Sequence, residues 1–194
     1  CKNLVMKNGP WITLLREAAE EKGVRHVTVG SGVRYDVLMK SSPDILRELA
    51  SRHVSGQLKI APEHTAPEVL RAMRKAPLYP LKDFAGDFSR AAAAAGKKLY
   101  LVPYFMSCHP GCGIGEMRRM REDILGVFRF LPEQVQAFIP LPMTLSSVMY
   151  YTGKDPLSGE TVFVERAPDR RRAQHDVLRR GQGRSLRGVI SPPG

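Results

Sequence analysis

Hydrophobic residues recur along this chain with two alternating spacings, and together these spacings predict an α/β protein. Apolar residues three or four positions apart predict four main helices, at residues 11–22, 43–53, 83–95 and 116–131. Short runs of aliphatic and aromatic residues predict four strands, at residues 24–29, 57–60, 98–105 and 134–139. Because strands and helices alternate, we expect a parallel sheet whose strands are neighbours in chain order, with helices packed on it.

The stretch from residue 58 to residue 75 places polar side chains between a strand and a helix. Glu63 and His64 lie in the connecting loop, and Thr65 is expected to cap the helix in a capping box with Glu68. In parallel α/β proteins, functional groups gather in the loops that follow the carboxyl ends of strands. Two similar strand-to-loop units, at residues 27–34 and 99–112, also end in polar residues. The sequence therefore predicts a site formed by three loops on one rim.

Composition and charge add a second hypothesis about partners. The 194 residues are 43% hydrophobic and 25% charged, as in ordinary globular proteins. No apolar run reaches the length of a membrane span, and three cysteines without a paired pattern favour a cytoplasmic location. The net charge is +11, and residues 166–187 hold eight Arg and two Asp, so 8 − 2 = +6 lies there. This segment predicts a basic helix at residues 168–180 that contacts another part of the protein, or else a nucleic-acid-binding module.

Several strings of residues resemble one known family, in the same order along the chain. They are the opening CKNL, GSGVRYDVL, LKIAPEHT, VLRAMRK, LYLVPYFMSCHPGC and FIPLPMTLSSVMYYTGKDPLSGE. These strings resemble the radical SAM enzymes, and most closely the YgiQ group, over residues 1–180. The resemblance implies that the parallel β/α units form the later part of a partial TIM-type barrel. Residues 1–150 would belong to that barrel, and residues 151–180 would form a basic C-terminal helical extension. The resemblance stops there, and the composition of residues 181–194, rich in Gly, Ser, Arg and Pro, predicts a disordered tail.

The resemblance also implies an activity. Radical SAM enzymes bind S-adenosylmethionine (SAM) at a [4Fe-4S] cluster and cleave it reductively to a 5′-deoxyadenosyl radical, with electrons from a protein such as flavodoxin or ferredoxin. The cluster motif, C-x3-C-x2-C, would lie upstream in an N-terminal part of the same protein that this chain lacks. The chain does not begin with Met, as expected of a piece of a longer protein. We expect the chain alone to be inactive, and no residue identifies the substrate or a catalytic group.

The same resemblance suggests residues that contact SAM. Arg34 and Glu63 hold positions similar to the SAM-contacting positions of the superfamily, where an arginine binds a carboxylate and an acid accepts from ribose hydroxyls. Ser31 and Tyr104 are predicted to belong to the same cofactor-binding set. Each has a structural alternative: Arg34 as a surface ion pair, Glu63 as part of a helix cap. For Ser107 the structural alternative is preferred.

Three cysteines are weak candidates for metal ligation. Cys108 and Cys112 have the first spacing of the cluster motif, but Gly115 stands where the third cysteine would be. A zinc site from Cys108, His109 and Cys112 lacks the fourth ligand of a structural site. We therefore expect a cysteine-containing loop at the rim. Cys1 closes a Cys-rich segment in similar proteins, so it is either a ligand of an auxiliary metal site or a spare thiol.

Overall fold

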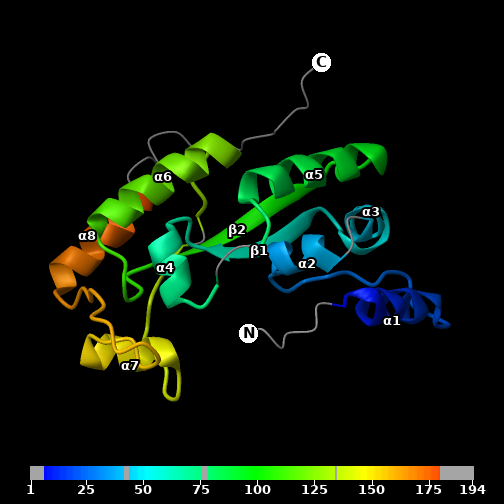
Figure 1. The fold of residues 1–194 in the computed structure, drawn as a ribbon. Helices are drawn as coiled ribbons and strands as arrows, with labels where there is room; N and C mark the ends of the chain where they lie inside the picture. The colour runs from blue at the N-terminus through cyan, green and yellow to red at the C-terminus, as the bar shows by residue number, and fades with distance from the viewer. Residues whose placement is uncertain (1–6, 42–43, 76–77, 134, 180–194) are drawn as a thin grey trace. The chain divides into compact units, whose positions relative to one another are not determined.

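The computed structural model describes residues 7–41, 44–75, 78–133 and 135–179 (Figure 1). Cys1 and the tail predicted at residues 181–194 lie outside the described residues. The chain divides into two compact units. The first consists of residues 1–62 and 77–104, and the second of residues 63–76 and 105–194.

Helices and strands alternate through most of the described chain, which confirms the predicted α/β class. The helices are α1 (Gly9–Glu20), α2 (Tyr35–Ser41), α3 (Ile45–Glu48) with a π-helical turn (Leu49–His53), α4 (Pro67–Ala72), α5 (Leu81–Ala94), α6 (Ile114–Phe128), α7 (Leu145–Thr152) and α8 (Pro168–Arg179). The strands are β1 (Gln57–Glu63), β2 (Tyr100–Ser107) and β3 (Val135–Ala137). Helices α2 and α7 were not predicted from the sequence.

The three strands form one sheet in the order β1-β2-β3, as predicted for the second, third and fourth strands. Strand β2 pairs with β3 in parallel, with Phe105 opposite Val135 and Ser107 opposite Ala137. The prediction of a strand at residues 24–29 is wrong, because this segment is irregular and mostly exposed. Its one backbone bond to a distant residue in the described chain joins the Val29 N–H to the His53 carbonyl. Further along the chain, Val33 pairs with the sheet by forming a parallel bridge with Ile60 of β1.

The core of the first unit lies among α2, α3, α5 and the strands. Phe84 on α5 is fully buried, and its ring packs against the rings of Tyr35 and Phe88. Leu49, Leu58 and Ile60 are also fully buried. The apolar stripe of α5, which the sequence periodicity predicts, packs against α2, α3 and the π-helical turn.

In the second unit, α6 and α8 lie side by side (Figure 1). Helix α6 buries Met117, Met120 and Ile124, and α8 buries Gln174 and Leu178, which are one helical turn apart. The basic helix predicted at residues 168–180 is thus confirmed as a helix over Pro168–Arg179, and its inner side is part of the core. In the part of the chain that the structure describes, the helices are too short or too polar to cross a membrane.

The capping box predicted at Thr65 is wrong. The residue before α4 is Ala66, and the buried Thr65 hydroxyl has no hydrogen-bond partner among the described residues. The Ala66 N–H instead donates to His64 Nδ1 at 3.0 Å. The imidazole therefore satisfies the amide of the residue that precedes α4, whereas a capping Thr65 would have accepted from the Glu68 N–H.

Candidate functional site

Two loops of the second unit follow the carboxyl ends of β1 and β2, where functional groups were predicted. Glu63 closes β1 with φ of +66°, and Cys108 follows β2 with φ of +63°. Left-handed backbone at non-glycine residues is strained, and such residues concentrate at functional sites. Both predicted loops therefore begin with a strained residue that carries a chemically active side chain.

The Glu63 carboxylate lies 3.2 Å from the ammonium group of Lys75, which follows α4. The side chains of Glu63 and Lys75 are only 28% and 17% exposed, so this pair is partly shielded from water. The alternative in which Glu63 caps the helix is not what the structure shows, because its carboxylate points to Lys75. Glu63 is a half-buried anion held beside a cation at the end of a strand.

A buried cluster joins the two loops to α8 within the second unit. His64, Cys112 and Gln174 are each at most 2% exposed. His64 Nε2 lies 3.5 Å from Cys112 Sγ, and Cys112 Sγ lies 3.5 Å from Gln174 Oε1. Because His64 Nδ1 accepts from Ala66, the neutral ring carries its proton on Nε2 and donates it toward the sulfur.

Gln174 satisfies the backbone of the cysteine loop. Its Oε1 accepts from the Cys108 N–H at 3.1 Å, and its Nε2 donates to the Cys112 carbonyl at 3.0 Å. A buried amide group without these partners would lose the hydrogen bonds it makes in water. Sequence reasoning did not single out Gln174. The signal was the four-residue spacing between Gln174 and Leu178, which places both on the inner side of α8.

Burial sets the protonation of this cluster. It raises the pKa of the Cys112 thiol to about 12 and also raises the pKa of Cys108. It lowers the pKa of His64 to about 4. At neutral pH the loop therefore holds two thiols and a neutral imidazole, whereas iron and zinc bind thiolates.

His109, the third residue weighed for zinc, uses both ring nitrogens inside the protein. Nδ1 donates to the Pro110 carbonyl at 2.8 Å, and Nε2 accepts from the Ser146 hydroxyl at 2.8 Å. The ring also packs edge-on against Phe138, and burial lowers its pKa. Across residues 7–41, 44–75, 78–133 and 135–179, no group of three or more His, Cys, Asp or Glu side chains is placed to hold a metal ion.

The other predicted cofactor residues lie in the first unit. Arg34 donates through Nε and Nη2 to the two carboxylate oxygens of Asp36, each at 3.1 Å. Asp36 is buried and also accepts from the Leu78 N–H at 3.2 Å. Arg34 is therefore an ion-paired residue, as its structural alternative held, yet its side chain stays 40% exposed. Ser31 is exposed and Tyr104 half-buried.

Ser107, for which a structural role was preferred, is fully buried at the end of β2. Its hydroxyl lies 3.5 Å from the Gln136 carbonyl and 3.4 Å from His175 Nδ1. These partners are on β3 and α8, so the side chain helps to join elements of the second unit. The observed contacts agree with the structural role.

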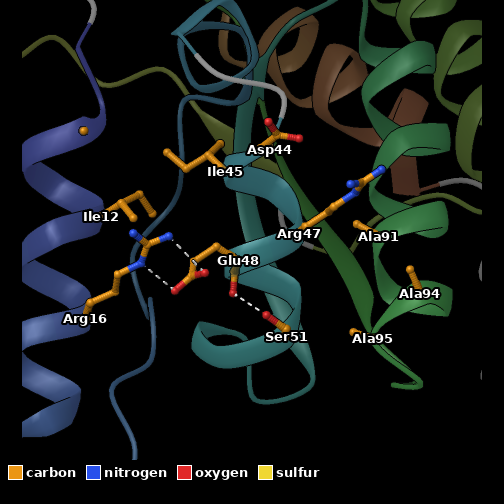
Figure 2. A pocket seen from close by; sticks show the side chains of 11 residues that line it. Ile12, Arg16, Asp44, Ile45, Arg47, Glu48, Ser51, Ala91, Ala94 and Ala95 are labelled. Atoms are coloured by element: carbon orange, nitrogen blue, oxygen red, sulfur yellow. Dashed lines mark hydrogen bonds and ion pairs between the residues drawn. The ribbon is translucent and has the colours of Figure 1, made fainter.

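The first unit also contains a cavity of about 480 Å³ between α1, α3 and α5 (Figure 2). Figure 2 shows Arg16 of α1 reaching across to Glu48, with Ala91 and Ala94 of α5 and the following Ala95 on the other side. Arg16 Nε and Glu48 Oε1 are 3.0 Å apart, and this contact raises the pKa of Arg16 and lowers that of Glu48. Arg16 and Glu48 thus pair with each other, and the lining also contains one acid, Asp44, and one base, Arg47, so positive and negative charges are balanced in number.

Comparison with known proteins finds relatives that are similar in sequence to this chain. A family model described as a domain of unknown function (DUF3362) matches residues 133–183, which contain β3, α7 and α8. A "UPF0313 protein" of Clostridium perfringens is 40% identical over 92% of this chain, which covers 27% of that protein. Relatives with the same name from Thermotoga petrophila and Methanocella arvoryzae are 41% and 38% identical over 96% and 92% of the chain, covering 33% and 29% of their lengths.

The chain therefore spans about a third or less of the relatives it matches. Its similarity to them extends through both units and includes the loops after β1 and β2. The match confirms the family resemblance drawn from the sequence strings. The chain belongs to the UPF0313 family, the YgiQ-type group, and represents part of such a protein.

Proposed function

We propose that this chain is part of a radical SAM enzyme of the YgiQ type, whose substrate is not identified. The observation that carries the proposal is the identity of about 40% with UPF0313 proteins over nearly the whole chain, together with the ordered strings that resemble radical SAM enzymes. The sheet β1-β2-β3, with parallel β2 and β3 and polar loops after β1 and β2, supports a place in the later part of a partial TIM-type barrel.

The cluster itself does not fit the described cysteines. Cys108 and Cys112 are buried thiols with raised pKa values, and each already contacts neighbouring protein groups. We therefore expect the three cluster cysteines in the part of the protein outside this chain. When bound, the cluster would supply the electron that cleaves SAM, and flavodoxin or ferredoxin would supply the reductant.

Arg34 and Glu63 fit a role in SAM binding. Asp36 binds the Arg34 guanidinium through Nε and Nη2, and Nη1 takes part in neither of these two hydrogen bonds. A carboxylate ligand can use that edge without displacing Asp36. Glu63 is a partly exposed acid at the end of β1, suitable for accepting hydrogen bonds from ribose hydroxyls.

The test of the activity uses the full-length protein, reconstituted with iron and sulfide under anaerobic conditions. With SAM and a reductant, we expect 5′-deoxyadenosine and methionine to form, as detected by mass spectrometry. Cluster-loaded protein that leaves SAM intact with every reductant would overturn the proposal. The isolated chain is expected to be inactive in the same assay.

The role of the two residues is tested by SAM affinity. In full-length protein, Arg34→Ala should weaken binding about tenfold to a hundredfold, because a charge-assisted contact contributes roughly 1.5–3 kcal/mol. Glu63→Gln should weaken it less. Exposed Arg25→Ala and Glu122→Gln are the matched controls. Unchanged calorimetric affinity in both test variants, with intact clusters, would return Arg34 and Glu63 to purely structural roles.

A second candidate, nucleic-acid binding by the basic segment, is less well supported by the contacts of that segment. Arg171 donates to the Phe138 and Glu165 carbonyls, and Arg166 donates to the Tyr150 carbonyl. Both guanidinium groups also lie 5.7 Å from the centre of the Tyr150 ring. These two charges therefore hold α8 in the second unit. Binding to RNA or DNA that weakens steeply with salt would favour this candidate.

A further inference from the structure

The second unit exposes a dense run of large apolar side chains between β3 and α8. Within the described part of the chain, eight of the thirteen exposed large hydrophobic residues lie between residues 139 and 163. The first six are Ile139, Leu141, Met143, Leu145, Val148 and Tyr151, which we call the apolar face. Single exposed hydrophobic residues are common on protein surfaces, but a run of this density is not.

The spacing of the apolar face follows the local structure. Its first three members recur at every second position before α7, and its last three recur at every third position along α7. Residues three apart on a helix share one side. Met149, which directly follows Val148, is completely buried. Helix α7 therefore carries a buried apolar side chain as well as a row of exposed ones.

The turn before α7 is built to display Met143. This residue is fully exposed and has φ of +63°, a conformation that methionine rarely adopts. The Leu141 carbonyl accepts hydrogen bonds from the hydroxyls of Thr144 and Ser147, which fixes the turn. Strained backbone that holds an apolar side chain in water has no evident benefit for this unit alone.

The apolar face is as large as the largest apolar patches found on monomers, and it could form much of one side of a standard interface. Its members are between 41% and 104% exposed. With about 200 Å² for the aromatic side chain and about 150 Å² for each of the others, these exposed fractions correspond to roughly 600 Å². The largest apolar patch of a typical monomer is about 300–600 Å², whereas a standard interface takes about 800 Å² from each partner.

We propose that the apolar face is covered by the part of the same protein that lies outside this chain. The matched relatives are about three times as long as the chain, which covers 27–33% of them, so a large intramolecular partner is at hand. An obligate interface within one polypeptide is also the kind that is rich in aliphatic and aromatic residues. This inference does not depend on radical SAM chemistry.

The test measures oxidation of Met143 by hydrogen peroxide, followed by peptide mass spectrometry. In the isolated chain Met143 should oxidise rapidly, because its thioether is open to solvent. In the full-length protein we expect oxidation at least tenfold slower. Met149, which is fully buried, is the internal control and should react slowly in both samples while the second unit stays folded.

A double substitution provides an independent measurement. Leu141→Ser with Met143→Ser should leave the thermal midpoint of the isolated chain unchanged and lower that of the full-length protein. Equal oxidation of Met143 in the two proteins would overturn the proposal. Slow oxidation of Met143 in the isolated chain would overturn it too. If that protection increases with protein concentration, a second copy of the chain covers the apolar face. If removing residues 180–194 abolishes the protection, the end of the same chain covers it.

Discussion

Replacing Gln174 by alanine removes the side chain that joins α8 to the cysteine loop after β2. Gln174 is 1% exposed, and it bonds the Cys108 N–H at 3.1 Å and the Cys112 carbonyl at 3.0 Å. The substitution leaves both backbone groups buried without these partners. Each unsatisfied buried group costs about 1–3 kcal/mol, so we expect a loss of about 2–5 kcal/mol in the free energy of unfolding.

That loss is large against the 5–15 kcal/mol typical of whole domains. With a urea m-value of about 2 kcal/mol/M, the midpoint should fall by roughly 1–2.5 M while the slope stays constant. Exposed Gln136→Ala on β3 is the matched control, and it should leave the midpoint nearly unchanged. The reactivity of Cys112 with Ellman's reagent should increase in Gln174→Ala at the same time.

A change of less than about 0.5 kcal/mol, equal to that of Gln136→Ala, would refute this reasoning. It would mean that water replaces the amide without cost, and so that the loop is not desolvated as its burial indicates. A large loss of stability without greater Cys112 reactivity would refute the specific claim that Gln174 encloses the thiol.

Three further outcomes follow from burial. The pKa of His64 is lowered from 6.5 to about 4, so between these values the unfolded state binds more protons, and the free energy of unfolding falls as the pH drops. We expect His64→Gln to remove about 3 kcal/mol of the loss of stability between pH 7 and pH 4, as measured by urea unfolding at the two pH values. The exposed His26→Gln is the control and should leave that loss unchanged. The pKa of Cys112 is raised to about 12, so the stability that its protonated thiol contributes is complete below the unfolded-state pKa near 9 and is lost as the pH rises toward 12. Cys112→Ala should therefore reduce the fall in the free energy of unfolding between pH 8.5 and pH 10.5, as measured by urea unfolding. Phe84→Ala should lower the free energy of unfolding by about 3–5 kcal/mol in thermal or urea unfolding, because its ring is fully buried against the rings of Tyr35 and Phe88. Leu14, which is 60% exposed, provides the control, and a smaller effect of Phe84→Ala than of Leu14→Ala would contradict the assigned core.

Local patterns predicted the longer elements well because their apolar spacing is set by the helix or strand itself. Helix α5, predicted at residues 83–95, spans Leu81–Ala94, and α6, predicted at residues 116–131, spans Ile114–Phe128. The strand at residues 24–29 fails because aliphatic residues favour a strand only where a neighbouring strand pairs with them. Helix α7 was missed because its apolar residues face two sides, so that no amphipathic pattern marks it.

The candidate site shows the same limit more sharply. Sequence reasoning placed Glu63, His64 and Cys112 in loops after strands, and the structure agrees for His64 and Cys112, whereas β1 runs three residues further than predicted and ends at Glu63 itself. It could not find their partners, since Gln174 is 62 residues from Cys112 and meets it only through the packing of α8. The capping box at Thr65 is wrong although the local motif is present, because α4 begins at Pro67 and the residue before it is Ala66.

The residues that sequence reading selects for reactivity are not reactive in the fold they build. A cysteine or histidine attracts attention because it can lose or gain a proton near neutral pH. Burial holds Cys112 as a thiol and His64 as a neutral ring, and Gln174 pairs with the thiol and its backbone. In the same unit Glu63 combines an ion pair with Lys75, a strained backbone and partial exposure. Among these neighbours Glu63 therefore has the properties expected of a ligand-binding group, and the buried cluster fixes the loops beside it.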